Sequence, residues 1–197
     1  MINAEIFAES FLGYNIVDCV IRNKGLFYFL VREDYTMWLD SEEDDGDLNP
    51  DDTELEKRVI SYTPSDPKDD QWGQVTLTGW RRSCVGLSVL PKEQLVVASI
   101  DGDIFAAGSG EFGQEKQLPR NKKSRRGGVR RLKTIDNRLY IVGGNRTVGF
   151  REGKNRWKWL TCDVPYPKEG YAHGFEDVDG FSHDDLYAVG GAASLLG

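Results

Sequence analysis

The sequence predicts an all-β fold made of repeated antiparallel meanders. Helical periodicity is almost absent, while short runs of β-branched, aromatic and aliphatic residues recur between turn residues. One motif occurs twice, as LYIVGG at residues 139–144 and as LYAVGG at residues 186–191. A motif that returns at a fixed period indicates a repeat architecture.

The clearest unit lies within residues 128–162, where VRRLKTI, RLYIVGG, TVGFRE and RWKWL read as four strands. The separators are Asp136-Asn137, Asn145-Arg146 and Gly153-Lys154-Asn155. Asn, Asp and Gly accept a positive φ at little cost, so each separator predicts a tight hairpin turn. This unit is therefore expected to be a four-stranded meander.

Three further stretches fit the same template. They are residues 14–80 with an acidic insertion at 40–56, residues 81–119, and residues 163–197 together with residues 1–13. In the first, NIVDCVIR, LFYFLVRED, YTMWLD, RVISYT and QVTLTGW read as strands. The anchor leucines Leu95, Leu139 and Leu186 are 44 and 47 residues apart, which suits propeller blades of roughly 40 to 50 residues. We expect one domain, a small or incomplete β-propeller of about four blades; a β-sandwich or barrel is the alternative.

The last unit offers few strands after residues 186–191, which would leave an open sheet edge. Residues 4–12, AEIFAESFL, precede the first complete unit. We expect them to supply the missing outer strand and to close the ring.

The two LY-x-VGG motifs, with Gly180-Phe181-Ser182-His183-Asp184-Asp185 before the second, resemble the inner strand of bacterial β-propeller repeats of the WD and YVTN types. The resemblance covers about the last seventy residues well and the rest loosely. Repeat proteins of this kind occur beside bacterial toxin genes, so the chain also resembles an immunity protein of a contact-dependent growth inhibition system. That resemblance implies a one-to-one complex with a cognate toxin, often a nuclease with a basic cleft.

Composition limits the compartment and the partners. The 197 residues carry a net charge of -7, which favours cationic partners. The three cysteines have neither metal-ligand spacing nor an even disulfide framework, which fits a reducing cytoplasm. The longest apolar run, residues 26–31, is far below the roughly 20 residues that span a bilayer. We therefore expect a cytoplasmic protein without a membrane segment.

The insertion Asp40–Glu56 holds ten carboxylates and no cation. As a calcium loop with Gly46 sixth, it would place Ser41 first and Asp52 twelfth, so the required ligands are missing. It is either a solvated loop or a lure, meaning a segment whose carboxylates imitate a phosphate backbone and bind a basic partner surface. The expected partner-binding residues are Asp40, Glu42, Glu43, Asp44, Asp45, Asp47, Asp51 and Asp52, with Trp38 and Trp72 as aromatic anchors.

The opposite charge gathers at Arg120–Lys133, where eight of fourteen residues are basic. This stretch is a flexible loop, a nucleic-acid contact, or the complement of an acidic patch within the same molecule. Trp157 and Trp159 share one face of a strand and are expected to pack inside.

Catalytic patterns are weak. Gly108-Ser109-Gly110-Glu111-Phe112-Gly113 fits G-x-G-x-x-G, but no helix pattern follows, so a glycine-rich hairpin is expected. Neither His173 nor His183 has cysteine or histidine neighbours at metal-ligand spacing. We expect a binding protein without enzymatic activity, metal or cofactor. The other hypotheses are a propeller scaffold or assembly factor and a lectin-like or carbohydrate-active propeller.

Overall fold

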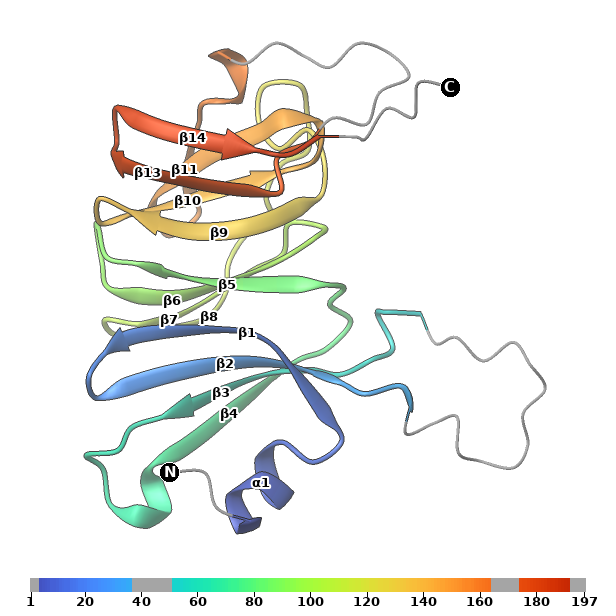
Figure 1. Cartoon of the computed structure of the whole chain (residues 1–197), viewed down its shortest axis with the longest axis vertical. Helices are drawn as coiled ribbons and strands as arrows, with labels where there is room; N and C mark the ends of the chain where they lie inside the picture. Colours follow the sequence, from blue (N-terminus) through green and yellow to red (C-terminus); the bar gives the residue numbers. More distant parts are fainter. Residues whose placement is uncertain (1–3, 37–50, 164–173, 192–197) are drawn as a thin grey trace, which may run out of the picture. The chain divides into compact units, whose positions relative to one another are not determined.

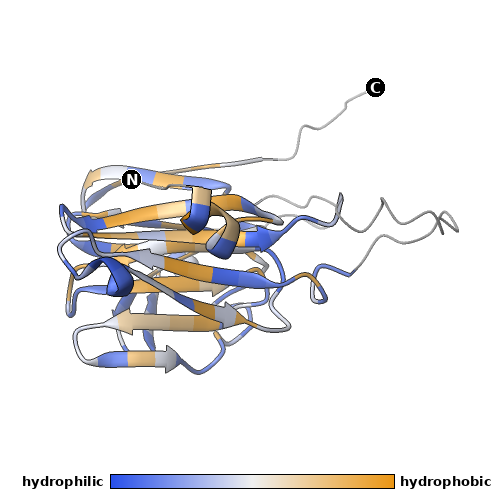
Figure 2. Ribbon diagram, turned by 90° about the horizontal axis from the view of Figure 1, so that it is seen from below, coloured by the Kyte–Doolittle hydropathy of each residue, from blue (hydrophilic) through white to orange (hydrophobic). Residues whose placement is uncertain are grey.

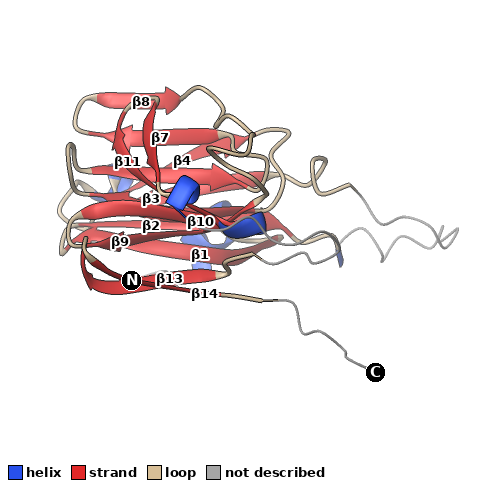
Figure 3. Cartoon of the chain, turned by 90° about the horizontal axis from the view of Figure 1, so that it is seen from above, coloured by secondary structure: helices blue, strands red, loops and turns tan. Residues whose placement is uncertain are grey.

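A computed structural model describes residues 4–36, 51–163 and 174–191 (Figure 1). The described residues form four antiparallel sheets, and helix is confined to short segments (Figure 3). The all-β prediction is thus confirmed, and the number of sheets is compatible with four blades. Closure into a propeller stays a prediction. The chain divides into two compact units, Met1–Arg82 and Ser83–Gly197.

The first unit contains one meander in the order β1-β2-β3-β4. Its strands are β1 (Tyr14–Asn23), β2 (Leu26–Glu33), β3 (Lys57–Tyr62) and β4 (Trp72–Leu77), with the short 3-10 helix η1 (Lys68–Asp70) before β4. The insertion joins β2 to β3, as expected from the sequence. The expected strand over residues 35–40 is not formed at Tyr35 and Thr36, and its other residues lie outside the described ranges.

The N-terminal segment is not the strand that we expected. Residues Ala4–Ser10 form the helix α1, whose last turn continues into hydrogen bonds from the amides of Phe11 and Leu12 to the Phe7 carbonyl. The Phe11 ring then makes edge-on contacts with Phe29 at 5.8 Å and with Trp72 at 5.9 Å. Alanine and glutamate favour helix, and the segment packs against the core through Ile6 and Phe11, whereas Phe7 is 50% exposed. In the described part, no helix is long and apolar enough to cross a membrane.

The second unit contains three sheets, in the orders β5-β6-β7-β8, β12-β11-β10-β9 and β13-β14. Each pairing is antiparallel and joins strands that are consecutive in the sequence. The strands are β5 (Ser83–Ser88), β6 (Gln94–Ser99), β7 (Ile104–Gly108), β8 (Glu111–Gln114), β9 (Val129–Ile135), β10 (Arg138–Gly143), β11 (Thr147–Gly153), β12 (Arg156–Trp159), β13 (Asp177–Ser182) and β14 (Asp185–Val189).

The turns of the second unit use the residues that the sequence marked. Asp136 and Asn137 both have positive φ, 47° and 64°, as the tight turn between β9 and β10 requires. Asn145 and Asn155 also adopt positive φ, at 54° and 58°, in the next two connections. The four-stranded meander expected within residues 128–162 is therefore confirmed.

The central sheet of the second unit is buried on both faces because its strands are apolar at successive positions. In β10, Leu139 and Ile141 pack with β5, β6 and β7, whereas Tyr140 and Val142 pack with Val178 of β13. Figure 2 shows hydrophobic residues gathered along the strands. At Gly86 of β5, an added Cβ would lie 2.6 Å from a methyl carbon of Leu139, so only glycine permits this close sheet-to-sheet approach.

Candidate functional site

Most of the acidic insertion lies outside the described residues. This applies to Trp38, Asp40, Glu42, Glu43, Asp44, Asp45 and Asp47. The structure describes the end of the insertion, residues 51–56, where it joins β3. Its first two residues, Asp51 and Asp52, are the two expected partner-binding carboxylates whose surroundings are known.

Asp52 is committed to contacts within the first unit. Its carboxylate lies 3.1 Å from the ammonium nitrogen of Lys57, a side chain that is only 1% exposed. The Lys57 ammonium also donates to the backbone carbonyls of Asp52 and, at 2.9 Å, of Leu55. Burial lowers the pKa of Lys57, against the opposing effect of Asp52. Asp52 further accepts a hydrogen bond from the Arg82 amide.

Asp51 remains exposed but is held by its own turn. Its carboxylate accepts hydrogen bonds of 2.9 Å from both the amide and the hydroxyl of Thr53, and these hydrogen bonds lower the pKa of Asp51. The Arg81 guanidinium lies 3.8 Å away. The C-terminal end of the acidic insertion is thus held by Lys57 of β3, by Arg32 of β2 at 3.9 Å from Asp52, and by Arg81 and Arg82 at the end of the unit. Asp52 therefore has a structural role, whereas Asp51 lies at the surface.

Trp72, the second expected aromatic anchor, is partly buried. Its ring stacks on Tyr62 with centroids 4.4 Å apart and belongs to the core cluster around Phe11, Val31 and Ile60. One part of the residue lines a groove of about 500 Å³. Most of this ring packs in the core, and only the part that lines the groove could contact a partner. Such a contact stays a prediction.

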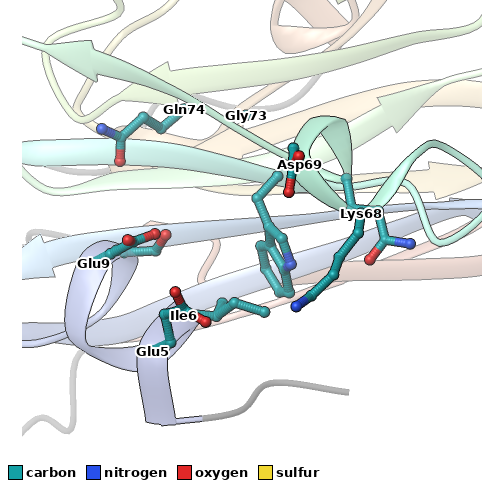
Figure 4. Close-up of a pocket in the computed structure, with 10 residues that line it drawn as sticks. Glu5, Ile6, Glu9, Lys68, Asp69, Gly73 and Gln74 are labelled. Carbon is teal, nitrogen blue, oxygen red and sulfur yellow. The ribbon is translucent and has the colours of Figure 1, made fainter.

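The groove beside Trp72 lies between α1, η1 and β4. Figure 4 shows Glu5 and Glu9 on the helix, with Lys68 and Asp69 on η1 across the hollow. Three carboxylates and one ammonium give this lining an excess of negative charge. The groove is therefore a second acidic surface of the first unit, built from described residues.

Three cations at the end of the basic stretch Arg120–Lys133 are paired with carboxylates within the second unit. Arg130, Arg131 and Lys133 lie 3.6, 3.7 and 3.2 Å from carboxylate oxygens of Glu176, Asp177 and Asp179, respectively. Each pair is separated by 46 residues, so the same register joins β9 to the segment at the start of β13. Arg125 is buried and donates to the carbonyl of Gly127 at 3.1 Å. Of the three readings of this stretch, complementarity to an acidic patch in the same unit describes these residues best.

The remaining sequence candidates have structural surroundings. Gly108 and Gly110 have positive φ in the hairpin between β7 and β8, as expected for a glycine-rich turn. His183 makes a hydrogen bond to the Tyr140 hydroxyl through Nδ1 and packs edge-on against Phe150. His173 lies outside the described residues. Within the described ranges, no three His, Cys, Asp or Glu side chains are placed to hold a metal ion.

A buried ion pair in the second unit was not predicted from the sequence. The Arg151 guanidinium contacts both carboxylate oxygens of Glu115 at 2.6 and 2.9 Å, and the two side chains are 0% and 2% exposed. Gln94 accepts a further hydrogen bond from Arg151 at 3.0 Å. Trp157 packs over the guanidinium, with 5.9 Å between the central carbon and the ring centroid. Trp157 and Trp159 are stacked and pack against the core, which confirms their expected role.

Comparison with known proteins finds a partial similarity. Over 103 residues the chain is 34% identical to Immune protein Tsi7 of Pseudomonas aeruginosa. The matched stretch covers 51% of this chain and 33% of that protein, so the chain spans about a third of the length of the curated protein that it matches. No family model and no solved structure matches the chain.

Proposed function

We propose that this chain is an immunity protein that neutralises a cognate toxin by direct binding. The similarity to Immune protein Tsi7 over about half of the chain is the observation that supports this proposal most directly. The net charge of -7 supports a cationic partner, because charge complementarity speeds association and favours correct pairing. The complex would form in the cytoplasm with one copy of each protein.

The proposed mechanism is occlusion of a basic toxin surface, such as the substrate cleft of a nuclease. The acidic insertion Asp40–Glu56 would occupy the positions of substrate phosphates, with its C-terminal end held by the contacts of Asp52 to Lys57 and Arg82. A fixed end lowers the conformational entropy that the insertion loses on binding. The groove lined by Glu5, Glu9 and Asp69 would add negative charge on the same unit.

The experiment is a protection assay with the domain encoded immediately upstream of this gene, where the proposed function places the toxin. Bacteria that express the toxin domain should stop growing, and co-expression of this chain should restore growth. The two proteins should also purify together as a one-to-one complex. A toxic domain that neither binds the chain nor loses toxicity in its presence would refute the proposed function.

A further inference from the structure

The second unit contains a small basic hollow on an otherwise acidic chain. Its volume is about 330 Å³, and it lies between the loop that precedes β6, the start of β8 and the turn from β11 to β12. Lys92, Lys154 and Arg156 line it, with Glu111 as the one lining carboxylate. Across the described residues, Lys154 and Arg156 have no carboxylate within ion-pair distance. The lining therefore has an excess of positive charge although the whole chain carries -7.

One wall of the hollow is fixed by a buried amide. Gln94 is 1% exposed, and its amide nitrogen donates to the Gly108 carbonyl at 3.2 Å and to Glu111 at 3.1 Å. Its amide oxygen accepts from Arg151 at 3.0 Å. Glu111 in turn accepts a 2.7 Å hydrogen bond from Lys92. Gln94 thus holds Glu111, and through it Lys92, in a defined position.

The opposite wall is fixed by the buried ion pair of Arg151 and Glu115. Glu115, which is bound to Arg151, accepts a 2.8 Å hydrogen bond from the backbone amide of Asn155. The Asn155 side chain accepts a 2.6 Å hydrogen bond from the amide of Lys116. Asn155 lies between the two cations that line this wall, so the Arg151–Glu115 pair connects both walls. Buried ion pairs are often no more stabilising than apolar packing, so stability alone does not explain this one. Holding the two walls of the hollow in position is a physical reason for its presence.

The electrostatics of the hollow are consistent with its lining. The hydrogen bonds from Lys92 and Gln94, together with the charges of Lys92 and Lys154, lower the pKa of Glu111. A negative group at this position is therefore stabilised by its surroundings.

We propose that this hollow, which we call the basic pocket, binds an oxyanion, either a carboxylate or a phosphate group. Arg156 and Lys154 would donate charge-assisted hydrogen bonds to the anion, and a guanidinium can meet either type of group through two donors. Gln94 and the Arg151–Glu115 pair act as positioning residues behind this surface. The proposal does not depend on the function proposed above, because it concerns residues of the second unit alone.

The test is an NMR titration of the whole ¹⁵N-labelled protein with sodium phosphate and, separately, with sodium acetate, at constant ionic strength set by chloride. The reporters are the amides of Gly153 and Asn155 and the side-chain amide of Gln94. We expect saturable shifts with a millimolar dissociation constant for at least one anion. The two arms distinguish phosphate from carboxylate as the preferred group.

Variants with opposite expected effects on anion affinity distinguish a loss of the binding site from a folding defect. Lys154→Gln with Arg156→Gln should weaken binding about tenfold, because two charge-assisted contacts to the anion are lost. Glu111→Gln removes the lining carboxylate and should tighten binding severalfold. Lys122→Gln with Lys123→Gln makes the same change of charge elsewhere in the unit and should leave binding unchanged. The proposal would be overturned by shifts that grow linearly without saturation for both anions. It would also be overturned if the Lys122 and Lys123 control lost as much anion affinity as the Lys154 and Arg156 variant.

Discussion

The buried pair of Arg151 and Glu115 gives a prediction whose size follows from the structure. Glu115→Gln keeps the shape of the side chain but removes the negative charge beside a guanidinium that is 0% exposed. At least one of the two contacts to Arg151, at 2.6 and 2.9 Å, then lacks an acceptor. An uncompensated buried charge costs about 3 to 5 kcal/mol, so we expect the second unit to lose about 3 kcal/mol of unfolding free energy.

The assay is urea unfolding followed by tryptophan fluorescence, for which Trp157 above the guanidinium is a natural probe. Arg151→Met and Glu115→Leu should each be strongly destabilising, whereas the double variant should be more stable than the sum of the two predicts by about 1 to 3 kcal/mol. A loss below 1 kcal/mol for Glu115→Gln, or strict additivity in the double variant, would refute the reasoning.

Three further predictions concern the acidic insertion, the ladder between β9 and β13, and the central sheet. Replacing Asp44, Asp45 and Asp47 with Asn should slow association with the toxin domain and flatten its salt dependence, measured by stopped-flow mixing; unchanged rates would remove the lure from the account. The pKa of Asp179 is lowered by the Gly180 amide and by Lys133, so its contribution to stability is present above the ordinary value of 3.8 and is lost as the pH falls through the lower folded value. The stability gap between wild type and Asp179→Asn should therefore close during acid titration from pH 6, and a gap that widens would contradict this sign. Gly143→Ala would place a Cβ 2.2 Å from the Gly128 carbonyl oxygen and should lower stability by about 1 to 3 kcal/mol in thermal unfolding, while Gly191→Ala, with no atom within 4 Å, should be neutral.

The sequence allowed the strands and turns to be predicted where local chemistry determines them. Asp136 and Asn137 mark a turn because their residue types accept positive φ, and the strands on either side follow from it. The helix at Ala4–Ser10 was missed because a short apolar segment suits either a strand or a helix until its packing against Phe29 and Trp72 is known.

The buried charge pair of Arg151 and Glu115 could not be predicted from the sequence. Arg151 lies in β11, whereas Glu115 is 36 residues earlier and directly follows β8 of another sheet, so only the packing of these two parts of the unit brings them together. The pairs from Arg130, Arg131 and Lys133 to the acidic segment repeat an offset close to the spacing of the leucine anchors. An acidic patch in the same molecule was one of the three interpretations of the basic stretch, and the repeat period indicates which segment carries that patch.

The central claim is that this chain binds and neutralises a toxin. Isothermal titration of the purified chain into the upstream toxin domain, made harmless by a substitution at its catalytic residue, tests the claim most directly. The account predicts a one-to-one complex whose affinity falls as salt is raised, because complementary charges guide and hold the partners. No heat of binding at micromolar concentrations of either protein, at low and at physiological salt, together with no co-purification, would contradict it.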